Sequence, residues 1–254
     1  MSTLAVIPAR LAATRLPRKP LRLLGGQPLV VRVWERVTAL AVADRVVVAT
    51  DSDEIAAAVR DAGGDVALTR ADHPSGTDRV AEVAALHAYA GATAILNVQG
   101  DEPFVSAAAL AGALSMVRDR GFPLGTAAVA VDGGARSRPE IVKIVAADDG
   151  RALYFSRAGI PFPRDGTGDP AAAGVPVLQH IGVYAYAPDA LARWVALPEH
   201  PLERCERLEQ LRPLAAGITM GVAVIDEAPA RGVDTEADLE AANARWAELH
   251  HGHR

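Results

Sequence analysis

Short apolar runs alternate with segments of helical periodicity along the first half of the chain. The runs at residues 4–7, 45–50, 65–69 and 92–98 predict buried strands, and the segments at 28–37, 54–62, 80–90 and 106–118 predict helices. Strands and helices that follow one another this closely form right-handed βαβ units. The pattern therefore predicts an α/β fold with a mostly parallel sheet.

The pattern changes after residue 131. Two apolar runs at 141–145 and 152–156 flank an Asp-Gly turn, which predicts an antiparallel hairpin. A strand at 180–186, helices at 188–196 and 202–217, a strand at 218–225 and a last helix capped by Thr235 with Asp238 follow. We expect a single domain, with a core at 1–131 and 218–254 and an added antiparallel hairpin lobe at 132–217.

The loop after the first strand is unusually basic. Between Pro8 and Pro20 it combines three prolines, several small residues and four cations, namely Arg10, Arg15, Arg18 and Lys19. Small residues let backbone N–H groups approach an anion, and proline reduces the entropy lost when a loop closes on a ligand. This combination predicts a polyphosphate-binding loop, with an ordinary solvated basic loop as the alternative. It is neither a Walker A loop nor a dinucleotide fingerprint, because no glycine lies between Ile7 and Gly25.

Two acids are candidates for a divalent cation site. Asp101 follows the strand at 92–98 in Gln99-Gly100-Asp101-Glu102-Pro103, and Asp234 lies in a glycine-containing turn before the last helix. Carboxylates at the carboxyl end of a parallel strand are well placed to hold a metal ion against a phosphate. An ordinary turn would account for either acid alone, and the nearby phosphate loop favours the metal.

Several other polar residues suit an anionic acceptor. Arg157 and Arg164 bracket the segment before a Gly-, Ala- and Pro-rich stretch at 165–176, and arginine suits bidentate carboxylate recognition. Glu203, Glu206 and Gln210 are spaced to share one face of the helix predicted at 202–217, where they could bind sugar hydroxyls. A solvated surface is the alternative for both groups.

Composition narrows the class of protein. The 254 residues are 50% hydrophobic and 22% charged. The net charge of −5 indicates a mildly acidic chain, without the overall positive charge that is typical of proteins that bind nucleic acids. No apolar run approaches the roughly 20 residues of a membrane span. The single cysteine, Cys205, precludes an internal disulfide and is expected to be a packing residue. We expect a cytoplasmic protein that binds neither nucleic acid nor membrane.

Together these motifs resemble those of the CMP-Kdo synthetases, the 3-deoxy-manno-octulosonate cytidylyltransferases. The matching stretches span nearly the whole chain in the family's order: IPAR…ATRLPRKPL (7–21), ATDSDEI (49–55), TRADHPSGTDR (69–79), NVQGDEP (97–103), ALYFSRAGIP (152–161), HIGVYAY (180–186), PLERCERLEQLR (201–212) and GVDTEADL (232–239). The resemblance implies a Rossmann-like nucleotidyltransferase sheet, with the core at 1–131 and 218–254 binding the nucleotide and the lobe at 132–217 serving acceptor binding and dimerisation. It also implies a Mg2+-dependent homodimer that transfers CMP from CTP to the anomeric hydroxyl of an acidic sugar and releases pyrophosphate.

The resemblance also assigns roles by position. Arg10, Arg15 and Lys19 would contact the CTP phosphates, and these three with Asp101 and Asp234 form the implied catalytic set. The nucleotide pocket would be completed by Pro8, Ala9, Ser75, Thr77, Arg79 and Gln99. Asp101 and Asp234 would bind Mg2+. The acceptor would be faced by Gln99, Arg157, Arg164, His180, Tyr184, Glu209 and Gln210.

Three departures from the family pattern leave the acceptor open. Arg18 stands where the family commonly has glycine, Pro74 where glutamine is frequent, and Ala187 where an arginine is usual. The preferred acceptor is 3-deoxy-manno-octulosonate (Kdo), with another small acid, such as the phosphonate phosphonoformate, as the alternative. A CTP- or phosphate-sensing protein would need the basic loop but not both acids, and a sugar-1-phosphate nucleotidyltransferase would predict a glycine-rich first loop.

Overall fold

The computed structural model describes residues 2–12, 15–164, 170, 174–227 and 231–251 of the 254-residue chain. The chain divides into two compact units, one of residues 1–107 with 230–254 and the other of residues 108–229. Each unit is described by itself below. Most of the Gly-, Ala- and Pro-rich stretch at 165–176 lies outside the described residues.

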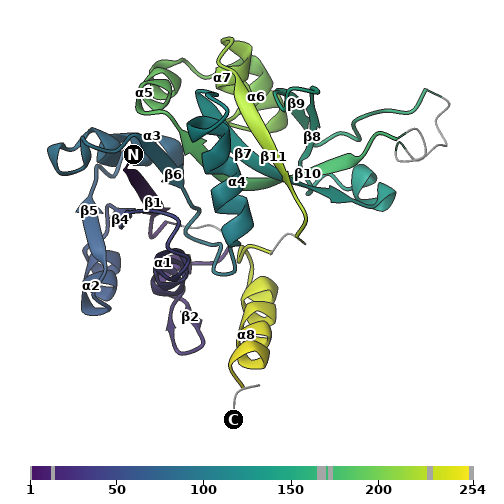
Figure 1. Ribbon diagram of the computed structural model, residues 1–254. Helices are drawn as coiled ribbons and strands as arrows, with labels where there is room; N and C mark the ends of the chain where they lie inside the picture. The colour runs from purple at the N-terminus through teal and green to yellow at the C-terminus, as the bar shows by residue number, and fades with distance from the viewer. Residues whose placement is uncertain (1, 13–14, 165–169, 171–173, 228–230, 252–254) are drawn as a thin grey trace. The chain divides into compact units, whose positions relative to one another are not determined.

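The first unit contains the parallel sheet that the apolar runs predict (Figure 1). Its strands are β1 (Thr3–Ala9), β4 (Arg45–Thr50), β5 (Asp65–Leu68) and β6 (Ala94–Asn97). β1 pairs in parallel with both β4 and β6, and β5 pairs in parallel with β4. The carboxyl ends of these strands therefore meet at one edge of the sheet, where an open α/β sheet binds its ligands.

Helices pack on this sheet as the periodicity predicts. α1 (Leu29–Ala39) contacts β4, α2 (Asp53–Asp61) contacts β5, and α3 (Gly76–Ala85) contacts β1. The prediction for α3 was misplaced: it begins at residue 76 rather than 80 and ends at 85 rather than 90. Ser75 caps the helix, since its hydroxyl accepts from the N–H groups of Thr77 and Asp78, and a separate 3₁₀ turn, η2 (His87–Tyr89), follows.

A small hairpin and the last helix complete the first unit. β2 (Leu23–Leu24) and β3 (Gln27–Pro28) pair antiparallel around Gly25, whose φ of 55° lies in the left-handed region. A Cβ on Gly25 would also lie 2.2 Å from the indole nitrogen of Trp246 in α8 (Glu236–His251). Glycine is therefore required there for both the turn and the close approach of α8. A hydrophobic cluster joins these segments: Leu16, Leu24, Leu29, Val233, Leu239 and Ala242.

The second unit contains strands that pair in both parallel and antiparallel directions. β11 (Met220–Ile225) runs parallel to β7 (Leu124–Val131), and β10 (Val177–Tyr186) runs antiparallel to β7. β8 (Lys143–Ala146) and β9 (Ala152–Ser156) form the predicted antiparallel hairpin, and β8 also pairs with β10. α4 (Ala107–Arg118) packs on this sheet, because a Cβ on Gly112 would lie 2.9 Å from the Cβ of Ala223 in β11. The α/β class with an added antiparallel hairpin is confirmed.

The division into units differs from the expected boundaries. We expected β7 and β11 to belong with the nucleotide-binding core, but both fall in the second unit. Within that unit β11 is hydrogen-bonded to β7, and β7 to β10.

The prediction of a single helix at 202–217 was wrong. The segment forms two short helices, α6 (Pro201–Glu206) and α7 (Leu211–Ala215), after α5 (Pro188–Ala196). Arg207 ends α6 with a left-handed backbone, φ 54° and ψ 49°, which an α-helix cannot continue through. The expected face of Glu203, Glu206 and Gln210 therefore does not exist as a helical stripe. Cys205 is exposed in α6, so the expectation that it packs internally was also wrong.

Among the described residues, no helix combines the length and the apolar character needed to cross a bilayer.

Candidate active site

The basic loop after β1 is anchored to the core at its centre. Leu16, which is 1% exposed, packs in the hydrophobic cluster with Leu24 and Leu29. Its neighbour Arg15 and the earlier Arg10 are exposed. The loop thus has a fixed apolar anchor next to charged side chains that remain accessible to an anion.

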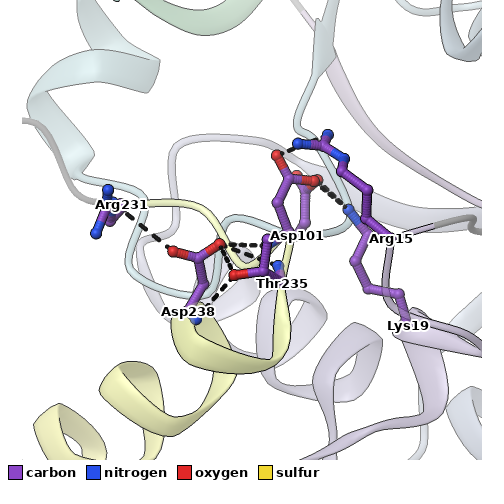
Figure 2. Close-up of polar contacts among 7 residues, drawn as sticks. Arg15, Lys19, Asp101, Arg231, Thr235 and Asp238 are labelled. Carbon is purple, nitrogen blue, oxygen red and sulfur yellow. Dashed lines mark hydrogen bonds and ion pairs between the residues drawn. The ribbon is translucent and has the colours of Figure 1, made fainter. Parts of the chain in front are cut away.

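Lys19 joins two acids that are far apart in the sequence (Figure 2). Its Nζ lies 2.6 Å from Oδ2 of Asp101 and 3.0 Å from Oδ1 of Asp234. Burial works against the charge of Lys19, but attraction and hydrogen bonds from both carboxylates outweigh it and raise the pKa of the ammonium. Arg15 adds a second cation, with Nη2 3.1 Å from Oδ2 of Asp234. The structure therefore brings together four of the five predicted catalytic residues.

A backbone contact holds the two acidic loops together. The N–H of Val233 donates to the carbonyl oxygen of Asp101 at 2.9 Å. Gly232 lies beside this contact, and a Cβ there would be 2.8 Å from Oε1 of Glu102. A larger residue at 232 would therefore displace the end of the Glu102 side chain.

At the N-terminus of α8, Asp238 and Thr235 form a cap (Figure 2), and this cap fixes the backbone of Asp234. Oδ2 of Asp238 accepts from the N–H groups of Asp234 and Thr235 at 3.3 and 3.0 Å, and from the Thr235 hydroxyl at 2.7 Å. The hydroxyl of Thr235 accepts in return from the N–H of Asp238 at 3.2 Å. This confirms the capping arrangement predicted from the sequence. It leaves the carboxylate of Asp234 to Lys19 and Arg15.

Glu102 is a third carboxyl group at this place, to which the sequence assigned no role. Burial, together with the negative charges of Asp101 and Asp234, raises its pKa to about 8, and Lys19 only partly opposes the shift. The carboxyl group is therefore largely protonated at neutral pH. The signal was visible as an acid directly after Asp101, but its burial could not be read from the sequence.

The pair of carboxylates fits a divalent cation that shares its coordination with phosphates. Their oxygens already face one positive group, the ammonium of Lys19, so the position favours positive charge. Within the described part of the chain, no three His, Cys, Asp or Glu side chains could hold a metal ion by themselves. Two carboxylates are a donor set that Mg2+ commonly takes together with substrate phosphates and water.

The residues predicted for the nucleotide side lie around the end of β1. A Cβ on Gly76 would be 3.4 Å from Cγ of Pro8, and one on Gly100 would be 2.8 Å from the carbonyl oxygen of Pro8. Pro8 therefore lies close to both the N-terminus of α3 and the Gln99–Asp101 turn. Ala9 is buried next to it at the end of β1.

Two of these residues have mainly structural contacts. Arg79 is 3% exposed, and its guanidinium pairs with Asp51 at 3.1 Å and also bonds the hydroxyl of Thr69. Thr77 is 6% exposed in the first turn of α3. Arg79 thus ties α3 to the loops after β4 and β5, so it supports this edge of the sheet from within.

On the predicted acceptor side, His180 and Tyr184 lie on β10. Their ring centroids are 5.3 Å apart, and Phe155 meets His180 edge to face at 5.0 Å. Burial lowers the pKa of His180 to about 3 and raises that of Tyr184 well above its ordinary value. Both side chains are therefore neutral at physiological pH.

Arg157 is held by the turn around it. Its Nε donates to the carbonyl oxygen of Glu206 at 2.9 Å, and its Nη1 donates to that of Pro139 at 3.2 Å. The carboxylate of Glu206 accepts from the N–H of Arg157 at 2.9 Å and from the Ser156 hydroxyl at 2.6 Å. Glu206 therefore serves to orient Arg157.

The remaining acceptor candidates differ in exposure. Gln210 is 3% exposed at the start of α7, Glu209 is partly buried, and Arg164 is exposed. Gln99 is partly buried after β6, in the first unit. The second unit thus holds all the predicted acceptor residues except Gln99.

Comparison with known proteins decides the family. A family model described as cytidylyltransferase matches residues 4–220. The chain is 60% identical to a 3-deoxy-manno-octulosonate cytidylyltransferase of Gemmatimonas aurantiaca over 98% of this chain and 96% of that one. It is 47% identical to the protein of the same name from Herminiimonas arsenicoxydans, over 94% and 96% of the two chains. The chain belongs to the 3-deoxy-manno-octulosonate cytidylyltransferase family.

A solved structure agrees with this family. The fold matches that of a CMP:2-keto-3-deoxy-manno-octonic acid synthetase in complex with CTP, with a TM-score of 0.89 at 38% identity. The match covers 98% of this chain and all of the other. The protein is therefore an enzyme, a nucleotidyltransferase of the cytidylyltransferase type.

One departure of this cytidylyltransferase from the family pattern has a structural explanation. Arg18 has a left-handed backbone, φ 56° and ψ 30°, which accounts for glycine at this position in the family. Its guanidinium pairs with Glu54 at the start of α2, and both side chains are more than half exposed. Arg18 thus contacts α2. Pro74 is exposed before the Ser75 cap, and Ala187 precedes α5 at its N-cap.

Proposed function

We propose that this cytidylyltransferase transfers CMP from CTP to the anomeric hydroxyl of Kdo, forming CMP-Kdo and pyrophosphate. The observation that carries the proposal is the convergence of Asp101 and Asp234 on Lys19 at the end of the basic loop. The names of the two curated relatives support Kdo as the acceptor. The CTP bound in the similar solved structure supports CTP as the donor.

Asp101 and Asp234 are the proposed ligands of Mg2+. Bound there, Mg2+ would act as a Lewis acid, neutralising charge on the triphosphate during in-line displacement at the α-phosphorus. The backbone bond from Val233 to Asp101 keeps the two carboxylates at a fixed spacing. The Asp238 cap restrains Asp234 in the same way.

The cations of the basic loop are proposed to bind the triphosphate. Arg10 and Arg15 are exposed and can bind phosphate oxygens in bidentate fashion. Lys19 balances the charge of the two carboxylates and adds positive charge where pyrophosphate leaves. Pro8, Ala9, Ser75, Thr77, Arg79 and Gln99 shape the nucleotide pocket in this proposal.

The acceptor is proposed to bind to Gln99, Arg157, Arg164, His180, Tyr184, Glu209 and Gln210. The guanidinium groups of Arg157 and Arg164 suit the carboxylate of an acidic sugar. His180 and Tyr184, both neutral, can exchange hydrogen bonds with its hydroxyls. Transfer to a phosphonate is not favoured, because relatives at 60% and 47% identity are named for Kdo.

Assembly and location are proposed from the family resemblance. We expect a homodimer in the cytoplasm that binds neither nucleic acid nor membrane. Sedimentation equilibrium of the purified enzyme would test the dimer, which should have twice the mass of the chain.

The test of the proposed function is pyrophosphate release from CTP and Mg2+ with one acceptor at a time. Kdo, N-acetylneuraminate and phosphonoformate should be offered separately, with a reaction that lacks any acceptor as the blank. We expect release with Kdo and only the blank rate with the other two. Release with phosphonoformate but not with Kdo would overturn the assignment of the acceptor, while keeping that of the phosphate loop.

A further inference from the structure

Thr126 is a fully buried polar residue of β7 that touches the ring of His180. Its hydroxyl oxygen lies 2.9 Å from Nε2 of His180 and 2.7 Å from the carbonyl oxygen of Val183. A third, longer contact of 3.4 Å reaches the carbonyl oxygen of Ile181. Thr126 is 0% exposed, so water does not compete for these hydrogen bonds.

A bulge in β10 explains why Thr126 has these partners. The register between β10 and β7 shifts between Ile181, which lies opposite Ala127, and Tyr184, which lies opposite Thr126. The two residues in between have no partner in β7. Such bulges redirect side chains and leave backbone groups outside the ladder. The hydroxyl of Thr126 satisfies the carbonyl group of Val183 that the bulge frees.

The proton count at Thr126 fixes the tautomer of His180. A threonine hydroxyl has one proton, and a carbonyl oxygen can only accept. If Thr126 donates to Val183, its oxygen must accept from His180, so the proton of the ring is on Nε2. The opposite tautomer would require the hydroxyl to donate to Nε2, which would leave the Val183 carbonyl oxygen facing a lone pair at 2.7 Å.

The surroundings keep the ring neutral and in place. Burial lowers the pKa of His180 to about 3, so a single ring nitrogen carries a proton at neutral pH. Phe155 and Tyr184 contact the ring at centroid distances of 5.0 and 5.3 Å. No hydrogen bond from the described part of the chain reaches Nδ1.

We propose that Thr126 is a positioning residue that holds His180 in its Nε2–H tautomer, so that Nδ1 accepts a hydrogen bond from a hydroxyl group of the acceptor. The ligand class is a polyol acid, and this inference rests on the proposed function. It specifies the direction of one hydrogen bond in that function: a hydroxyl group of the acceptor must donate to Nδ1 of His180. A derivative with an oxo or methoxy group in place of this hydroxyl would therefore bind poorly.

Nitrogen NMR of the ¹⁵N-labelled enzyme reports the tautomer without any substrate. Two-bond ¹⁵N–¹H correlation at pH 7 should show His180 with a protonated Nε2 and an unprotonated Nδ1. Thr126→Val should lose this single pattern, and Thr126→Ser should keep it. Ser115→Ala removes a similar hydroxyl-to-carbonyl bond within α4 and should leave the His180 signals unchanged. A protonated Nδ1 in the wild type would overturn the proposal.

Kinetics then test whether the tautomer serves the acceptor. Thr126→Val should raise the KM for Kdo about tenfold, as expected for one lost hydrogen bond, while the KM for CTP stays the same. The unfolding midpoint should fall in this variant, because the buried carbonyl group of Val183 loses its donor. Thr126→Ser should restore most of the acceptor affinity. An unchanged KM for Kdo in a folded Thr126→Val enzyme would also overturn the proposal. Absence of Kdo turnover in the wild type would instead contradict the proposed function, while the spectra would still decide the tautomer.

Discussion

At the scale of single residues, the site depends on one ammonium group between two carboxylates. The side chains of Lys19, Asp101 and Asp234 are all partly shielded, with 19%, 26% and 42% of their surface exposed. Charges in such places interact more strongly than in bulk water but still require partners. The sequence predicted these three residues as functional. It could not predict that they touch, because the spacing of loops is set by tertiary structure.

Replacing Lys19 should impair chemistry more than folding. Lys19→Met removes the positive charge next to both carboxylates, and we expect kcat to fall about 100-fold, as when one electrostatic stabiliser is lost from an active site. Arg22→Met is the matched control, since it removes a partly exposed cation that pairs with the exposed Glu236, and kcat should change less than twofold. Steady-state assays of pyrophosphate release check both. Equal losses in the two variants would refute a specific role for Lys19.

His180 should make the enzyme sensitive to acid. Its folded-state pKa of about 3 lies below the ordinary value of 6.5, so the unfolded chain binds the proton first as pH falls. The folding stability associated with His180 is complete above pH 6.5. It should decline by about 1 kcal/mol per pH unit as pH falls from 6.5 toward 3.

His180→Gln cannot titrate in this range and should flatten the decline. Urea unfolding between pH 4.5 and 7 would measure the difference in slope between wild type and variant. His87→Gln, at an exposed histidine, is the control and should follow the wild type. Parallel curves for wild type and His180→Gln would show that His180 protonates equally in both states.

At the scale of elements, the break between α6 and α7 shows where sequence patterns fail. Apolar and charged residues from 202 to 217 recur with helical spacing, and this spacing does not predict the left-handed backbone of Arg207. The two helices are joined instead by a buried ion pair. Glu203 accepts from Nε and Nη2 of Arg212 at 2.8 and 2.6 Å.

Breaking this ion pair should destabilise the second unit. Glu203 is 6% exposed and also caps α6 by accepting from the N–H of His200 at 3.2 Å. Glu203→Gln leaves the charge of Arg212 without its carboxylate, so we expect a loss of about 3 kcal/mol in unfolding free energy. Glu199→Gln, which disrupts an exposed pair with Arg204 at 3.8 Å, should cost less than about 0.5 kcal/mol.

Chemical denaturation would measure the loss of unfolding free energy in Glu203→Gln and in Glu199→Gln. Similar small losses in the two variants would mean that the Glu203–Arg212 pair contributes no more than a surface contact.

At the scale of the whole molecule, periodicity and turn chemistry predicted most of the fold. Strands β1, β4, β5 and β6, helices α1, α2 and α5, and the β8–β9 hairpin occur close to the predicted positions. Local sequence signals suffice for these elements, because hydrophobic periodicity, capping residues and turn residues all favour the same structure. The bulge of β10, the buried state of Glu102 and the partners of Lys143 did not follow from the sequence, since each depends on contacts between distant segments.

Lys143 illustrates this limit. It is 0% exposed, and its ammonium donates to the carbonyl oxygens of Arg138, Ile141 and Arg157. All three of its hydrogen-bond donors are thereby used, and burial lowers its pKa. A lysine in a strand gives no sequence signal for such a set of hydrogen bonds to the backbone. These bonds support the backbone of Arg157, one of the residues proposed to bind the acceptor.

The central claim is that Asp101 and Asp234 support cytidylyl transfer to Kdo. ³¹P NMR of CTP, Kdo and Mg2+ with the enzyme tests it most directly, because it resolves the phosphodiester product from pyrophosphate. We expect both products in equal amounts with the wild type and with the control Asp119→Asn, which alters an exposed acid after α4. Asp101→Asn and Asp234→Asn should form them at least about 100-fold more slowly. Full Mg2+-dependent formation by either variant would contradict the account, as would the absence of a phosphodiester with the wild type.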